Sequence, residues 1–168
     1  GRAVTKFVNF MINSFAARFM PDTNQTTMKK ILIVDDEPNI VMSLEYTFKR
    51  QNFEVFIARD GMEALEILKN QLPDVIILDI MMPLVDGFET LQKIKSNEQL
   101  NHCKVMFLSA KNKESDIEKG LSLGADAYLT KPFSIKKVVD QVNELLGLSH
   151  GIIADGVVST EEAQYLQK

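Results

Sequence analysis

The chain of 168 residues is long enough for one domain with short extensions, and a content of 45% hydrophobic and 25% charged residues is typical of a globular protein. This composition excludes a disordered chain, a collagen-like chain and a coiled-coil rod, and the net charge of −4 argues against a general nucleic-acid binder. The single cysteine excludes an intrachain disulfide and favours a cytoplasmic protein, and no apolar run is long enough to predict a membrane span.

Residues 1–27 carry apolar side chains at a helical spacing, which predicts an amphipathic N-terminal extension. The stripe consists of Val4, Phe7, Val8, Met11, Ile12, Phe15 and Phe19. Because the segment is basic, it could contact a membrane surface or a groove on a partner protein. It could equally be an artificial addition or a piece of another domain.

Residues 28–148 alternate between apolar strands and amphipathic helices, which predicts five strand–helix units. We predict strands at 31–34, 54–58, 75–78, 105–108 and 128–129. We predict helices from Pro38 and at 61–70, 88–96, 113–123 and 135–146. Near-continuous apolar strands are typical of parallel strands that are buried on both faces. The pattern therefore predicts an α/β domain with a doubly wound, five-stranded parallel sheet.

Residues 149–168 form a C-terminal extension that is predicted to be helical. The stretch from Asp155 to Glu162 is similar to the second half of a calcium-binding EF-hand loop. Gly151 and Ile153 stand where that loop needs acidic ligands, so calcium binding is not expected. A Ser159 cap with Glu162 three residues later predicts a short helix instead.

Ionisable and hydroxyl side chains stand at the ends of four predicted strands: Asp35 and Asp36, Asp79, Ser109 and Lys131. In a doubly wound sheet the site lies at the carboxyl ends of the strands, so these side chains should converge on one edge. Three carboxylates in one place repel each other. A hard divalent cation such as Mg²⁺, which prefers oxygen ligands, would compensate that repulsion.

The same side chains suit the transfer of a phosphoryl group, because Lys131 adds a positive charge and Ser109 a hydroxyl donor. A carboxylate can itself be the nucleophile and form an aspartyl phosphate. Asp79 is the best candidate for this role, since it ends the central apolar strand.

Four motifs in this order resemble a response-regulator receiver domain of bacterial two-component signalling, which is CheY-like. They are Ile33–Glu37, Asp79–Gly87, Leu108–Ala110 and Gly124–Phe133. The resemblance covers residues 28–148 and implies a flavodoxin-like (βα)5 fold with strand order 2-1-3-4-5.

The resemblance implies that Asp79 is the phosphoacceptor, supplied by a sensor histidine kinase, a phosphotransfer protein or a small phosphodonor. It implies that Mg²⁺ is held by Asp36 directly and by Asp35 largely through water. Asp79 and the backbone carbonyl of Met81 would complete the metal shell.

The resemblance also implies roles for residues around the phosphoryl group. Ser109 and Lys131 would each bind a phosphoryl oxygen, and Tyr128 would be a switch that moves inward when Ser109 shifts. The bond that precedes Pro132 would be cis.

The expected function is a phosphorylation-dependent signalling switch. Such a domain is not a conventional enzyme, although it catalyses its own phosphoryl transfer and a slow autodephosphorylation. Output is expected through a protein partner, or through self-association by the last two helices or the tails. DNA binding is not expected, because no DNA-binding domain of useful length follows.

Three other interpretations stay open. Asp35 and Asp36 could cap the following helix. The chain could be a phosphatase with an aspartate nucleophile, although such enzymes place a second acid where Met81 stands. It could also be a receiver used only for protein docking, which the presence of Asp36, Asp79 and Lys131 argues against.

Overall fold

The computed structural model describes residues 2–19 and 27–148. The first described segment is a single helix, α1 (Arg2–Phe19), on which Val4, Phe7, Val8 and Met11 of the predicted stripe are exposed. Within the described segments no helix is both long and apolar enough to cross a membrane. The predicted C-terminal helix lies in 149–168, outside the described residues.

The second segment contains a five-stranded parallel sheet in the order β2-β1-β3-β4-β5. Its strands are β1 (Lys30–Val34), β2 (Glu54–Ala58), β3 (Val75–Leu78), β4 (Lys104–Ser109) and β5 (Ala127–Thr130). Its helices are α2 (Pro38–Arg50), α3 (Gly61–Ile67), α4 (Gly87–Ser96), α5 (Glu114–Ser122) and α6 (Ile135–Leu145). The predicted fold and strand order are confirmed.

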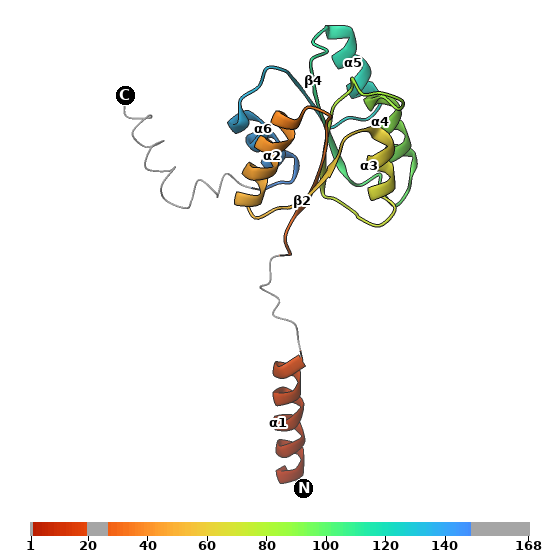
Figure 1. Cartoon of the computed structure of the whole chain (residues 1–168). Coiled ribbons are helices and arrows are strands. Elements are labelled where there is room, and N and C mark those ends of the chain that lie inside the picture. Colours follow the sequence, from red (N-terminus) through yellow and green to blue (C-terminus); the bar gives the residue numbers. More distant parts are fainter. Residues whose placement is uncertain (1, 20–26, 149–168) are drawn as a thin grey trace, which may run out of the picture.

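Helices cover both faces of this sheet, with α2 and α6 on one side and α3, α4 and α5 on the other (Figure 1). Two apolar clusters follow from this arrangement, because alternate residues of a strand point to opposite faces. Leu32 and Val34 of β1 belong to the cluster under α3 and α4, whereas Ile31 and Ile33 belong to the cluster under α2 and α6. Strand β3 is therefore apolar throughout, and β1 is apolar from Ile31 to Val34.

Several predicted boundaries differ from the structure by one to three residues, and two of these differences have a clear physical reason or consequence. Helix α3 ends at Ile67 rather than at residue 70, because the N–H groups of Lys69 and Asn70 donate to carbonyls three residues back and tighten the chain into a turn. Strand β4 includes Ser109, whose carbonyl accepts the N–H of Lys131 at 2.8 Å. Ser109 is thus held by the sheet rather than by a loop.

Candidate functional site

The first feature of the site is a group of three carboxylates at the carboxyl edge of the sheet. Asp35 follows β1 and Asp79 follows the neighbouring β3, and both are buried, while Asp36 is exposed. The N–H of Asp79 donates to the carbonyl of Val34 at 2.9 Å, which continues the strand pairing and fixes the backbone. One oxygen from each of the three carboxylates lies within 4.8 Å of the others.

Asp79 lies in surroundings that disfavour its negative charge. Its pKa is raised from 3.8 to about 6, chiefly by burial and then by the charge of Asp35. Three groups act in the opposite direction: the ammonium of Lys131, 3.7 Å from Oδ2, the N–H of Met81, 3.4 Å from Oδ1, and the N–H of Ile80. The positive groups around Asp79 thus do not fully offset burial and the charge of Asp35, so an additional cation would stabilise its carboxylate.

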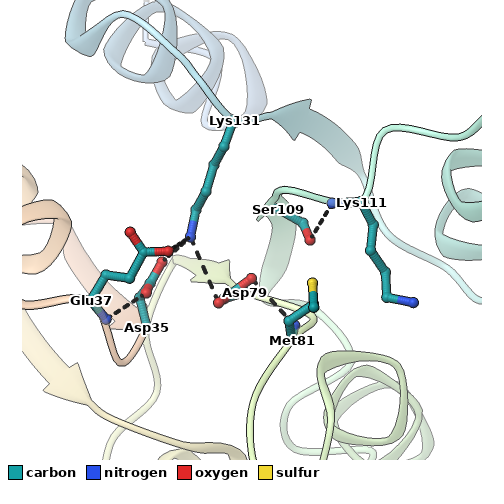
Figure 2. Close-up of polar contacts among 7 residues, drawn as sticks. All are labelled: Asp35, Glu37, Asp79, Met81, Ser109, Lys111 and Lys131. Carbon is teal, nitrogen blue, oxygen red and sulfur yellow. Dashed lines mark hydrogen bonds and ion pairs between the residues drawn. The ribbon is translucent and has the colours of Figure 1, made fainter.

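Lys131 reaches the carboxylates from the end of β5. Its Nζ lies 3.0 Å from Asp35 Oδ2 and 3.0 Å from Glu37 Oε1, besides its contact with Asp79 (Figure 2). Burial acts to lower the pKa of Lys131, but the hydrogen bonds to Glu37 and Asp35 outweigh burial and raise that pKa. Glu37 belongs to the first sequence motif, yet no sequence pattern assigned it this contact.

The capping interpretation of Asp35 and Asp36 is wrong. The residue that precedes α2 is Glu37, and its side chain makes no capping hydrogen bond. Asp35 Oδ1 accepts the N–H of Glu37 at 2.9 Å, a local turn in which the side chain bonds the backbone two residues later. The other oxygen of Asp35 is thereby left for Lys131.

Ser109 and Tyr128 both bind the backbone of Lys111. Ser109 Oγ accepts the N–H of Lys111 at 3.2 Å, and the hydroxyl of Tyr128 donates to the carbonyl of Lys111 at 2.6 Å. In the view of Figure 2, Ser109 and Lys131 stand on opposite sides of Asp79. The pKa of Tyr128 is raised, first by burial and next by the charge of Asp116.

Gly87 holds the loop after Asp79 close to the strand. Its N–H donates to the carbonyl of Ile80 at 3.0 Å. A Cβ atom at this position would clash with the carbonyl oxygen of Asp79 and lie 2.6 Å from the Cα of Ile80. Only glycine lets α4 begin this near to Asp79.

The peptide bond between Lys131 and Pro132 is cis.

The structure thus brings Asp35, Asp36, Asp79 and Lys131 together, and it joins the side chains of Ser109 and Tyr128 to the backbone of Lys111. The Met81 side chain is 58% exposed, and its N–H faces Asp79. Sequence reasoning missed Glu37 and the central place of the Lys111 backbone.

Residues 31–143 match the family model of the response regulator receiver domain, a range that contains every site residue from Asp35 to Lys131. A curated relative is the alkaline phosphatase synthesis transcriptional regulatory protein PhoP of Bacillus subtilis, 42% identical over 118 residues. The match covers 70% of the chain and 48% of PhoP, so the chain spans about half the length of this relative. Since PhoP is a transcriptional regulator, the expectation against DNA binding is not supported.

Solved structures show the same likeness. The chemotaxis protein CheY4 of Vibrio cholerae is 30% identical with a TM-score of 0.68, and the match covers 71% of the chain and 100% of CheY4. The receiver domain of the Francisella response regulator 1452 is 35% identical with a TM-score of 0.65, and the match covers 71% of the chain and 97% of that domain.

Proposed function

The chain belongs to the family of response regulator receiver domains, which are phosphoryl-accepting switches of two-component signalling, and we propose that Asp79 is its phosphoacceptor. One observation carries the proposal. Asp79 ends the central strand β3, is 4% exposed, and lies between the ammonium of Lys131 and the N–H of Met81. No other aspartate within residues 27–148 has both partners.

The carboxylate of Asp79 would be the nucleophile. With a pKa of about 6 it is mostly ionised at neutral pH, which is the form that attacks. A bond forms between a carboxylate oxygen and phosphorus while the bond from phosphorus to the donor breaks. Lys131 and the hydroxyl of Ser109 would then each pair with a phosphoryl oxygen, and both already flank Asp79 (Figure 2).

The donor set fits Mg²⁺. Three carboxylate oxygens within 4.8 Å are hard ligands, and exposed Asp36 leaves space for the waters that Mg²⁺ keeps. We propose Asp35, Asp36, Asp79 and the carbonyl of Met81 as the residues that would hold the ion. When bound, it would offset the negative charge of the phosphoryl oxygens.

The switch would run from Ser109 to Tyr128 through the backbone of one residue, Lys111. A phosphoryl oxygen on Asp79 would accept the hydroxyl of Ser109 and draw its Oγ away from the N–H of Lys111, while Tyr128 holds the carbonyl of Lys111. Loss of the first contact frees the loop and biases the domain between two conformations. The face formed by α5, β5 and α6 would then bind a protein partner or a second copy.

We further propose that a sensor histidine kinase or a phosphotransfer protein supplies the phosphoryl group, in the cytoplasm. Residues 28–148 would suffice for this reaction, with 1–27 and 149–168 as extensions. A chain reduced to 28–148 should therefore unfold cooperatively and accept phosphate at a rate close to that of the full chain. Loss of cooperative unfolding would assign the extensions to the core.

The phosphoacceptor proposal is tested by incubating the full chain with acetyl phosphate and Mg²⁺ and measuring the hydroxylamine-sensitive band shift on a Phos-tag gel. Asp79→Asn should abolish the shift. Asp86→Asn is the matched control, because Asp86 caps α4 through the N–H of Glu89 and asparagine caps equally well. Undiminished labelling of Asp79→Asn would refute the proposal.

A further inference from the structure

Helix α5 contains a glycine in its interior. Gly120 is buried two residues before the end of the helix. Glycine disfavours helix relative to alanine, because the backbone loses more conformational freedom there. A glycine at such a position therefore calls for a reason in the packing around it.

Two aromatic rings occupy the space that a side chain of Gly120 would need. A Cβ atom there would lie 3.1 Å from both Cδ2 and Cε2 of Phe107 and 3.1 Å from Cδ2 of Tyr128. These distances are shorter than ordinary van der Waals contact. The ring centroids of Phe107 and Tyr128 are 5.7 Å apart, and Phe107 packs edge-on against Phe88 at 5.5 Å.

Phe107 is fully buried and packs against Phe88 and Tyr128, which limits how far its ring can shift. Tyr128 is half-buried and is the ring that can move. Its hydroxyl hydrogen bond to the carbonyl of Lys111 is short, at 2.6 Å, and a shift of the ring away from α5 would lengthen and weaken it. The position of the Tyr128 ring against α5 thus determines whether its hydroxyl reaches the backbone of Lys111, which also contacts Ser109.

We propose that Gly120 is a positioning residue of the switch: the missing side chain lets the Tyr128 ring lie against α5, where its hydroxyl holds Lys111. The signalling meaning of this inference rests on the proposed function, since it takes Tyr128 as the switch residue. A side chain at position 120 would displace the ring and weaken its hydrogen bond to the carbonyl of Lys111. Helix α5, which packs on Tyr128, thereby becomes part of the proposed switch that links Asp79 through Ser109 to Tyr128.

The experiment follows Tyr128 directly in the full chain. The sequence has no tryptophan and three tyrosines, so Tyr46→Phe with Tyr165→Phe leaves Tyr128 as the fluorescent residue. Acrylamide quenching of its fluorescence is measured with and without beryllofluoride, a phosphoryl mimic, in the presence of Mg²⁺. The variants are Gly120→Ala, the space-conserving pair Gly120→Ala with Phe107→Leu, and the control Leu121→Ala, whose side chain is exposed on the same helix.

Gly120→Ala should raise the quenching constant at least twofold and reduce the beryllofluoride response to less than half. The pair with Phe107→Leu should restore both, and Leu121→Ala should change neither. Three results would overturn the inference: wild-type quenching in Gly120→Ala, the same change in Leu121→Ala, or no recovery in the pair.

Urea unfolding of each variant distinguishes a role of Gly120 in folding from its role in positioning Tyr128. Failure of both Gly120 variants to unfold cooperatively would show that Gly120 is needed for folding alone, which also overturns the inference. Absence of any acetyl phosphate labelling in the wild type would refute the phosphoacceptor proposal instead. The quenching without beryllofluoride would still decide the role of Gly120.

Discussion

The aspartates at the two edges of the parallel sheet have different partners, and the amino edge shows how a structural aspartate is satisfied. Asp126, which precedes β5, accepts the N–H of Val105 at 2.9 Å and the ammonium of Lys95 at 3.2 Å. Asp74, which precedes β3, accepts the N–H of Lys30 at 2.8 Å. Each charge is answered by a short hydrogen bond from the backbone.

At the carboxyl edge Asp79 lacks such bonds, although the neighbouring Asp35 accepts the N–H of Glu37 at 2.9 Å. Asp79 has an N–H at 3.4 Å and an ammonium at 3.7 Å, and it faces the charge of Asp35. The short hydrogen bonds of Asp126 and Asp74 tie neighbouring strands together. The long contacts of Asp79 leave its carboxylate oxygens able to bind a ligand. The aspartates also differ in burial, since Asp79 is buried, Asp74 is half-buried and Asp126 is exposed. The contrast can be tested from both edges.

The largest expected effect comes from neutralising Asp79. Because its folded pKa is raised from 3.8 to about 6, the stability that it contributes is complete below about pH 3.8 and is lost as the pH rises through about 6. Without Mg²⁺, Asp79→Asn should therefore raise the free energy of unfolding at pH 7 by up to about 3 kcal/mol, at about 1.4 kcal/mol per pKa unit. Urea unfolding at several pH values measures this, and the gain should shrink toward zero near pH 3.8. If Asp79→Asn instead lowered the free energy of unfolding at pH 7, the charge of Asp79 would be stabilising, as at the amino edge, and the contrast would be refuted.

The opposite sign is expected at the amino edge. Asp126→Ala should lower the free energy of unfolding by about 2 kcal/mol, because the N–H of Val105 loses its acceptor inside the protein and Lys95 loses its partner. Asp140→Ala is the control, since its pair with Lys136 is exposed and 3.7 Å long, and it should cost no more than about 0.5 kcal/mol. Equal effects of the two variants would show that Asp126 is no better anchored than a surface aspartate.

Magnesium should bind at the carboxyl edge and stabilise the fold there. At 100 times its dissociation constant, a ligand of the folded state adds about 2.7 kcal/mol. Asp36→Ala removes a carboxylate that we propose as a direct ligand and should weaken Mg²⁺ binding at least tenfold, or by about 1.4 kcal/mol. The shift of the urea midpoint with Mg²⁺ concentration measures this, with Asp60→Asn as an acid outside the group. An unchanged affinity in Asp36→Ala would place the ion elsewhere.

The smallest expected effect concerns the lifetime of the phosphorylated form. By family resemblance, Met81 and Lys111 flank the path of the hydrolytic water, and neither side chain can accept a strong hydrogen bond from it. The double variant Met81→Asn with Lys111→Glu should lose phosphate several times faster than the wild type. Time courses at fixed Mg²⁺ and pH test this, and an equal or slower loss would refute the account while leaving Asp79 as acceptor.

Much of the fold could be predicted from the sequence because its signals are local. Apolar strands, helical spacing and the polar residue that ends each strand predicted the sheet and its site edge. The end of α3 was missed because 68–70 keep a helical pattern while forming a turn. The contact between Glu37 and Lys131 joins residues 94 positions apart, and no spacing rule encodes it.

The space around a residue is equally invisible in a sequence. Gly120 stood inside a predicted helix without drawing notice, because the rings that fill its side-chain volume come from two strands. The backbone of Lys111 became important only when Ser109 and Tyr128 were both found on it. Side-chain chemistry was predictable, whereas the backbone acceptors and the packing between elements were not.

The close approach of Gly87 to Asp79 bears on how tolerance to substitution should be interpreted. A library that samples every position should find residue 87 nearly as intolerant as residue 79, since any Cβ atom displaces the carbonyl of Asp79. Yet Gly87 has no side chain to take part in the reaction. Intolerance alone therefore does not identify a reacting group in this protein, and retained folding together with lost labelling does.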